Sequence, residues 1–273
     1  MPQIINTNIP SLNAQRNLNT SQTALNTALQ RLSSGLRVNS SKDDAAGLAV
    51  AEKMNAQARG MVVASRNASD GISLAQTAEA GMNVISEHLQ RMRELAVQSA
   101  SGQWDSDNRN ALDTEYQELR SEIGRVISAT NFNGQKLLDG TFSGGVTFQV
   151  GPTTSDESQI TVSIGQLVYS TLSSISGTDG LNALSEMAEL DTLIQTINTN
   201  RASLGAIQNR FEGVLTQLSS AHEATEASRS RIMDADYAAE TAKLARGQVL
   251  QQAGVAMLTQ ANALPQNVLR LLQ

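Results

Sequence analysis

Apolar side chains near the N-terminus recur at helical spacing. Leucines stand seven residues apart, and two of them are followed by another leucine four residues later: Leu18, Leu25, Leu32, Leu29 and Leu36. Gln22 interrupts this a/d-like pattern. Because side chains three or four residues apart share one face of a helix, the pattern predicts a helix that packs along a narrow line.

The C-terminal arm carries a similar pattern with smaller side chains. Leu250, Met257 and Leu264 stand seven residues apart, with Gly254 and Ala261 between them. A leucine-rich seam and a small-residue seam can approach closely, so we expect the two arms to pair as a coiled coil, although neither is stable alone in water. The alternative is two ordinary core helices of one bundle, but neither arm has the charged face that such helices expose.

Longer helical patterns occupy most of the chain between the arms. They predict helices over about 44–100, 105–129 and 181–228. Ser41 and Asp44 resemble a capping box before the first of these helices, and Asp105 or Ser106 can cap the second.

Two short runs in mid-chain alternate apolar and polar residues. They contain Val146, Phe148 and Val150, and then Ile160, Val162 and Ile164. A polar loop separates them, which predicts a β-hairpin within about 135–175. The expected fold class is therefore mainly α: an elongated antiparallel helical rod with its N- and C-terminal helices paired in a coiled coil, plus this small β-hairpin region.

Composition supports long thin helices rather than a thick core. Aromatic residues make up 3% of the 273 residues, hydrophobic residues 40%, and there are only 4 prolines. There is no cysteine, which excludes disulfides and zinc–sulfur sites. We expect no membrane-spanning segment, because no stretch of about twenty apolar residues occurs. The first residues lack the basic and apolar regions of a secretory signal peptide.

Charge is distributed unevenly along the chain. All 26 acidic residues lie between Asp43 and Glu240, and residues 247–269 carry no charge. The basic residues at the two ends are too dilute, and too poor in aromatic neighbours, for a nucleic-acid-binding arm. The pattern instead indicates that the two ends share one environment and the middle another.

Two short stretches resemble metal-binding motifs, but neither has the complete set of residues that such a site needs. The two histidines, His88 and His222, cannot form a ligand cluster, and HEATE at residue 222 has Glu226 where a zinc protease has its second histidine. DSDNRN at residue 105 resembles a calcium loop, but Arg109 occupies a ligand position. We expect no catalytic residue, no metal site and no cofactor, and hence no enzyme.

Several longer stretches resemble bacterial flagellin. They are INTNIPSLNAQRNL, ALQRLSSGLRVNSSKDDAAGLAVAEKM, LQRMRELAVQSASG, TNFNGQKLLDG and SRIMDADYAAETAKLARGQVLQQAGVAMLTQANALPQNVLRLL. The resemblance covers roughly the first 140 and last 90 residues, and the large central domains of many flagellins are missing. The chain therefore resembles a near-minimal flagellin.

The resemblance implies a structural subunit that polymerises into the flagellar filament for swimming. Residues 1–42 and 233–273 would form an inner coiled-coil domain, and residues 43–232 an outer rod domain. Open-ended contacts between copies would build a helical polymer. The residues expected to pack in the filament's inner core are Leu18, Leu25, Leu29, Leu32, Leu36, Leu250, Met257, Leu264 and Leu271.

The resemblance also implies partners and a location. Besides itself, the chain would meet an export chaperone at its C-terminal segment and the filament cap and hook-junction proteins, with no nucleic acid and no membrane. It would be secreted through the flagellar type III route into the extracellular filament. QRMRELAVQ is similar to the stretch read by Toll-like receptor 5. The residues expected to contact that receptor or another subunit are Gln90, Arg91, Glu94, Leu95, Leu112 and Glu115.

Three other functions remain open at this point. A hook–filament junction protein shares terminal helices with flagellin, although QRMRELAVQ favours flagellin. A flagellin-like enzyme would need a catalytic insert, for which the chain has little room. A free coiled-coil secreted effector would stay monomeric on filament seeds.

Overall fold

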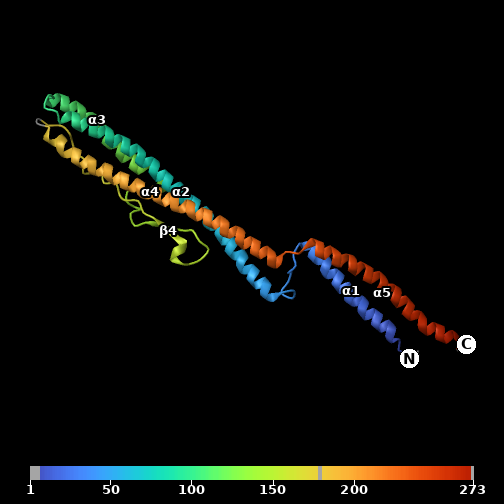
Figure 1. Cartoon of the computed structure of the whole chain (residues 1–273). Coiled ribbons are helices and arrows are strands. Elements are labelled where there is room, and N and C mark those ends of the chain that lie inside the picture. The colour runs from blue at the N-terminus through green and yellow to red at the C-terminus, as the bar shows by residue number, and fades with distance from the viewer. Residues whose placement is uncertain (1–6, 178–179, 272–273) are drawn as a thin grey trace. The chain divides into compact units, whose positions relative to one another are not determined.

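The structure, a computed structural model, describes residues 7–177 and 180–271, with side chains as far as residue 263. The chain divides into two compact units. The first is made from both ends of the chain, up to Ala56 and from Ala224 onward, and the second is Gln57–Glu223. Long helices dominate both units (Figure 1), which confirms the expected mainly α fold.

Among the described residues, three long helices come first, the short strands follow together, and two long helices come last. In chain order they are α1 (Ile9–Ser34), α2 (Ala45–Ser99), α3 (Ser106–Ala129), β1 (Asn131–Phe132), β2 (Gln135–Lys136), β3 (Val146–Gln149), the 3-10 helix η1 (Asp156–Ser158), β4 (Gln159–Val162), α4 (Leu181–Met233) and α5 (Tyr237–Leu271). Helices α2 and α4 contribute residues to both units. No helix in the described ranges is long and apolar enough to cross a membrane.

In the first unit, α1 and α5 lie side by side (Figure 1). They run antiparallel, since Leu25 lies next to Gly247 while Leu18 lies next to Gly254. At the end of α1, Gly35 adopts the left-handed conformation with φ of +72°, which glycine tolerates best. The N–H of Gly35 donates to the carbonyl of Arg31 at 2.9 Å and closes the last turn.

The start of α2 differs from the expected capping box. Asp44, not Ser41, caps the helix: its Oδ1 accepts the N–H of Gly47 at 2.7 Å. The preceding residues form their own turn, because Asp43 Oδ2 accepts the N–H of Ser40 at 2.9 Å. These bonds lower the pKa of Asp43, led by the backbone N–H of Asn39. Ser41 lies inside that turn and is not available as a cap.

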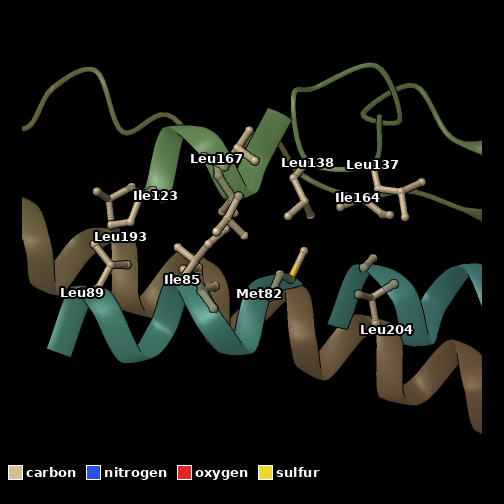
Figure 2. Close-up of a cluster of buried hydrophobic side chains, with 14 of the residues drawn as sticks. Met82, Ile85, Leu89, Ile123, Leu137, Leu138, Ile164, Leu167, Leu193 and Leu204 are labelled. Carbon is tan, nitrogen blue, oxygen red and sulfur yellow. The ribbon is translucent and has the colours of Figure 1, made fainter. Parts of the chain in front are cut away.

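The second unit has the larger core. Figure 2 shows side chains from α2, α3, α4 and the intervening loops meeting at its centre: Met82, Ile85, Leu89, Ile123, Leu137, Leu138, Ile164, Leu167, Leu193 and Leu204. Asp105 caps α3, since its side chain accepts the N–H of Asn108 at 2.9 Å. The sequence had left Ser106 as the other candidate for this cap.

The expected β-hairpin is present, with strands shorter than the alternating runs. Strands β3 and β4 pair antiparallel, and Val150 and Ile164, at the ends of the runs, are buried just beyond them. Phe148 of β3 packs edge-on against Phe211 of α4, with ring centroids 5.8 Å apart. The ring of Phe211 fills the space beside Gly71 of α2, where a Cβ atom would lie 2.5 Å from it. The hairpin is thereby fixed to the helices through aromatic packing.

Candidate functional site

The contact between α1 and α5 follows a heptad pattern on both helices. The less exposed positions of α1 along this seam are Ser11, Ala14, Leu18, Ser21, Leu25, Ala28 and Leu32. Those of α5 are Glu240, Leu244, Gly247, Gln251, Gly254, Leu258 and Ala261. Spacings of three and four residues that alternate in this way are typical of a coiled-coil seam.

Glycines let the two helices of this seam approach closely. A Cβ atom on Gly247 would lie 3.4 Å from the Cβ of Leu25, and one on Gly254 would lie 3.1 Å from Leu18 Cδ1. The leucines of α1 therefore pack against the backbone of α5. This contact is of the predicted kind, in which a leucine-rich seam packs against a small-residue seam. Leu32 lies half-buried further along the seam of α1.

The phase of the seam on α5 differs from the one expected. Leu250 and Met257, placed in the seam by the sequence pattern, are 49% and 64% exposed. The row that faces α1 is Gly247, Gly254 and Ala261, which has the same seven-residue spacing three residues earlier. On α1, Leu29 is 47% exposed and also lies off the seam.

These exposed side chains belong to a set of large apolar residues on the terminal helix pair that point away from the seam. On α5 it comprises Val249, Leu250, Val255 and Met257, and on α1 Ile9, Leu12 and Leu29. Each of the seven is at least 47% exposed. Leu264 and Leu271, also expected in the inner core, lie outside the residues whose side chains are described. We call these seven residues the outward face.

Polar side chains also cross the seam. Gln251 Nε2 donates to Gln22 Oε1 at 2.8 Å in the middle of the seam, and Ser11 Oγ donates to Asn262 Oδ1 at 2.8 Å near its end. At the other end Glu240 is 5% exposed: Arg31 Nη1 of α1 lies 3.9 Å from its Oε1, and Lys243 Nζ of its own helix donates to its Oε2 at 2.8 Å. The interruption noted at Gln22 is therefore a satisfied polar contact.

Backbone bonds join the end of α1 to the link between α4 and α5. Gly35 O accepts the N–H of Ala235 at 2.9 Å, and the N–H of Arg37 donates to Met233 O at 2.6 Å. The guanidinium of Arg37 donates to Ile232 O at 2.6 Å. Around them Val38, Ala51 and Met233 form a small core. We call this region the joint.

In the second unit, three of the predicted contact residues form an ionic cluster on α2 and α3. Arg91 Nη2 lies 2.8 Å from Glu115 Oε1, and Arg91 Nη1 lies 3.0 Å from Glu94 Oε2. The hydrogen bonds, first of all that to Glu115, raise the pKa of Arg91. All three side chains are largely exposed, so the cluster is a solvated surface feature.

The other three predicted contact residues are placed differently. Gln90 is exposed beside the cluster, and Leu112 is half-buried and packs against the main core. Leu95 is 1% exposed and belongs to that core. Its side chain supports the α2 surface from beneath and does not lie on it.

A buried polar network at the end of the second unit was missed by the sequence reasoning. Arg109, which was noted only as a mismatch in a calcium-like loop, is 2% exposed. Its guanidinium donates to the carbonyls of Ser99 at 2.9 Å, Ser101 at 3.2 Å and Gly177 at 3.2 Å. Nearby, Tyr116 donates to Glu186 Oε2 at 2.9 Å. A charged residue in a polar stretch gives no sequence signal that it will be buried.

None of these arrangements suits catalysis. Within residues 7–177 and 180–271, no group of three or more His, Cys, Asp or Glu side chains could hold a metal ion. Burial, the largest cause, and the bond to Glu186 raise the pKa of Tyr116 far above its ordinary value, so it stays a neutral donor. The fold and the outward face define a helical structural protein whose terminal helices present an apolar surface.

Comparison with known proteins identifies the family. The model of the bacterial flagellin N-terminal helical region matches residues 5–143, and that of the C-terminal helical region matches residues 187–272. A flagellin of Halalkalibacterium halodurans is 44% identical over 272 residues, which cover 99% of this chain and 100% of that protein. The chain belongs to the bacterial flagellin family.

Solved structures agree with this assignment. The crystal structure of Bacillus cereus flagellin shares 34% identity at a TM-score of 0.50, covering 56% of this chain and 88% of that one. A Vibrio parahaemolyticus structure, described as that of a flagellar hook-associated protein, has a TM-score of 0.59, covering 70% of this chain and 100% of that one. At 14% identity this second likeness shows the fold alone.

Family membership gives the function. Flagellins are structural proteins and not enzymes, and they polymerise with copies of themselves into the filament of the bacterial flagellum. This chain is accordingly a structural subunit of that extracellular filament.

Proposed function

We propose that this flagellin polymerises through the outward face of its terminal helix pair, which neighbouring copies cover in the filament. The single observation that carries the proposal is the exposure of Val249, Leu250, Val255 and Met257 on α5, at 64%, 49%, 52% and 64%. Four large apolar side chains within the uncharged part of α5, residues 247–269, are unusual on a surface that faces only water.

The burial of this face contributes favourably to assembly. Complete burial of a Val, Leu or Met side chain contributes about 1.5–3 kcal/mol, so four half-exposed side chains supply on the order of 4 kcal/mol per subunit. The residues of α1 on the same face, Ile9, Leu12 and Leu29, add to this sum. Because each copy presents the face and its neighbour covers it without closing a ring, the contacts repeat into a helical polymer.

The proposed arrangement has two layers. Residues 1–42 and 233–273 form the inner coiled coil, and residues 43–232 form the outer rod. The charge distribution supports this assignment, since residues 1–42 and 241–273 contain no acidic residue. Acidic side chains are costly to bury without a partner, so they suit the layer in contact with solvent.

Seeded polymerisation tests the outward face. We compare wild type with Met257→Asp, Met257→Leu and Gln252→Asp, and with a chain lacking residues 247–273. Met257→Asp would bury a charge, so we expect the critical concentration to rise at least about tenfold, while Met257→Leu stays near wild type. Gln252→Asp adds the same charge at an exposed polar position of α5, and we expect a smaller effect.

The outcomes of this assay separate the proposal from its rivals. If Met257→Asp polymerises like Met257→Leu, the outward face is not the assembly surface. A wild-type chain that stays monomeric on competent filament seeds would favour a hook–filament junction protein or a free effector instead.

The same face suits the partners that the subunit meets before assembly. We infer that the chain leaves the cell through the flagellar type III route and that an export chaperone covers the apolar C-terminal segment until then. The filament cap and the hook-junction proteins would meet the terminal helices at the ends of the polymer. Pull-down of the chaperone by wild type, and its loss with the chain that lacks residues 247–273, is the expected result.

A second surface is proposed as a contact for Toll-like receptor 5 or for another subunit. It comprises Gln90, Arg91, Glu94 and Glu115, with Leu112 at its edge, while buried Leu95 supports it. The mutual ionic contacts of Arg91, Glu94 and Glu115 favour this surface because they hold charged groups in a fixed pattern. Arg91→Ala should lower receptor activation and leave the helix content unchanged, and equal activation by both proteins would refute the assignment.

A further inference from the structure

The apolar packing between α1 and α5 is compatible with two registers. Leu18, Leu25 and Leu32 repeat every seven residues on α1, and Gly247, Gly254 and Ala261 repeat every seven on α5. In the structure Leu25 packs on Gly247 and Leu18 packs on Gly254. A slip by one heptad, about 10 Å along the helix, would place Leu32 on Gly247, Leu25 on Gly254 and Leu18 on Ala261.

The slipped register would satisfy the leucines at least as well as the native one. Each of the three would then meet a glycine or an alanine, whereas in the native register Leu32 lies near the level of Glu240, which is 5% exposed. Apolar burial and small-residue packing therefore do not select the native alignment. Another contact must do so.

The polar pair in the middle of the seam distinguishes the two registers. In the native register Gln251 Nε2 donates to Gln22 Oε1 at 2.8 Å. After a one-heptad slip, Gln251 would face Leu29 and Gln22 would face Leu258, so Gln251 would lose its partner on α1 and Gln22 would keep only its bond to Asn26 on its own helix. A polar side chain left unpaired against apolar neighbours is unfavourable, and a single buried polar position is known to specify register in coiled coils.

We propose that the Gln22–Gln251 pair specifies the register of the terminal helices, and with it the arrangement of the outward face. A slip would move Ile9, Leu12 and Leu29 by about 10 Å along the apolar residues of α5, so neighbouring copies would meet a different surface. This inference rests on the assembly surface proposed above.

Other contacts also favour the native register and must be separated from the glutamine pair, among them the ion pair between Arg31 and buried Glu240 and the bond from Asn8 Nδ2 to Ala261 O. Ser11 bonds Asn262 at the far end of the seam, and the joint holds Gly35 to Ala235. Most bonds of the joint come from backbone groups, which any sequence can supply, although Arg37 and the small core around Val38 also contribute, and ten residues between α1 and α2 give the chain room to follow a slip. The glutamine pair is the hydrogen bond between side chains in the middle of the seam.

Disulfide trapping reads the register directly, because the natural chain has no cysteine. Leu25→Cys with Gly247→Cys reports the native register, since a Cβ on Gly247 lies 3.4 Å from that of Leu25, close to the separation in a disulfide. Leu25→Cys with Gly254→Cys reports the slipped register. Each reporter is placed in the full chain and oxidised both as soluble subunits and as filaments, and denaturing gels separate loops within one chain from links between chains.

Three backgrounds are compared. Gln22→Leu with Gln251→Leu removes the pair, Gln22→Glu with Gln251→Lys replaces it by a charged pair, and Gln15→Leu with Gln252→Leu makes the same change at exposed positions. In wild type we expect native cross-links to exceed slipped ones at least about tenfold, because the slip breaks the amide bond between the helices and leaves Gln251 unpaired against Leu29. The leucine pair should bring the ratio within about threefold of unity, and the charged pair should restore it.

Every outcome bears on the proposal. A ratio in the leucine-pair background equal to that of wild type would mean that the joint and the other contacts across the seam, at Arg31, Ser11 and Asn8, set the register, and the proposal would fail. An equally large fall in the ratio of native to slipped cross-links in the Gln15/Gln252 control would show a general effect of hydrophobic substitution. That result would also overturn the proposal. If wild type gave no filaments, the proposed assembly surface would fail, while the cross-link ratio in soluble subunits would still decide the register.

Discussion

Replacing Gly71 by alanine should destabilise the second unit, although the same change at Gly213 should stabilise it. Both glycines lie inside long helices, α2 and α4, where alanine is favoured by about 0.5–1 kcal/mol. A Cβ on Gly213 would meet nothing within 4 Å, so that gain is kept. A Cβ on Gly71 would lie 2.5 Å from Phe211 Cζ and within 3.0 Å of two more ring atoms.

The ring of Phe211 has little room to move aside. Its side chain is 0% exposed and packs against the edge of Phe148. Overpacking of such a site costs about 1–3 kcal/mol, which exceeds the helix gain and leaves Gly71→Ala about 1–2 kcal/mol less stable. For a unit of this size that corresponds to a Tm about 3–6 °C lower, while Gly213→Ala should raise Tm by about 1–3 °C.

Fluorescence of Trp104 is a suitable readout, because it is the chain's only tryptophan and lies in the second unit. A double-mutant cycle with Phe211→Leu adds a control. The smaller side chain should make room for the new methyl group, so Gly71→Ala should cost less in the Phe211→Leu background. If Gly71→Ala raises Tm as Gly213→Ala does, or if the two changes at this contact are additive, the reasoning about a rigid ring is wrong.

Three further predictions concern polar contacts in the second unit. The hydrogen bond from Arg93 holds the pKa of Asp191 below its ordinary value. The stabilisation that ionised Asp191 gives is therefore complete above about pH 4 and is lost as the pH falls through the folded-state pKa. Asp191→Asn should flatten the acid side of a Tm–pH curve. Arg109→Met should lower the unfolding free energy by about 2–4 kcal/mol, because three carbonyls lose a charged donor, and urea denaturation measures it. Tyr116→Phe should cost about 1–3 kcal/mol by leaving Oε2 of buried Glu186 without its donor, while Oε1 keeps the N–H of Ser173, and an unchanged urea midpoint would contradict this.

The sequence predicted the pairing of the terminal helices but not the phase of the seam. A seven-residue spacing identifies the packed face of a helix only if a single row of residues has that spacing. Helix α5 has two such rows: the first is Gly247, Gly254 and Ala261, and the second is Leu250 and Met257. Hydrophobicity favours the second row, yet the first lies against α1. The reason is steric: leucines on α1 need small residues opposite them for the helices to approach closely.

Two other residues show where sequence reasoning reaches its limit. Leu95 stands within a stretch that resembles flagellin, but a motif match carries no information on burial, and its side chain is 1% exposed in the core. Arg109 is buried because carbonyls from distant parts of the chain converge on it, including that of Gly177, 68 residues away. Contacts of that range depend on tertiary structure and leave no local pattern.

The distribution of large apolar side chains explains why one chain contains two such different units. The second unit buries Phe142, Phe211, Tyr116 and many leucines and isoleucines, so it holds its own core. In the terminal pair, the seam positions of α5 include glycines, which weaken a helix by about 1 kcal/mol each relative to alanine. Larger residues there would strengthen α5 alone but force α1 away. Apart from Leu244 and Leu258 in the seam, the large apolar residues Val249, Leu250, Val255 and Met257 of α5 stand on the outward face, where only another molecule can bury them. The same distribution of residues therefore makes the terminal helix pair unstable on its own and lets it bind neighbouring subunits. A subunit needs both properties if its ends are to become fully stable only within the polymer.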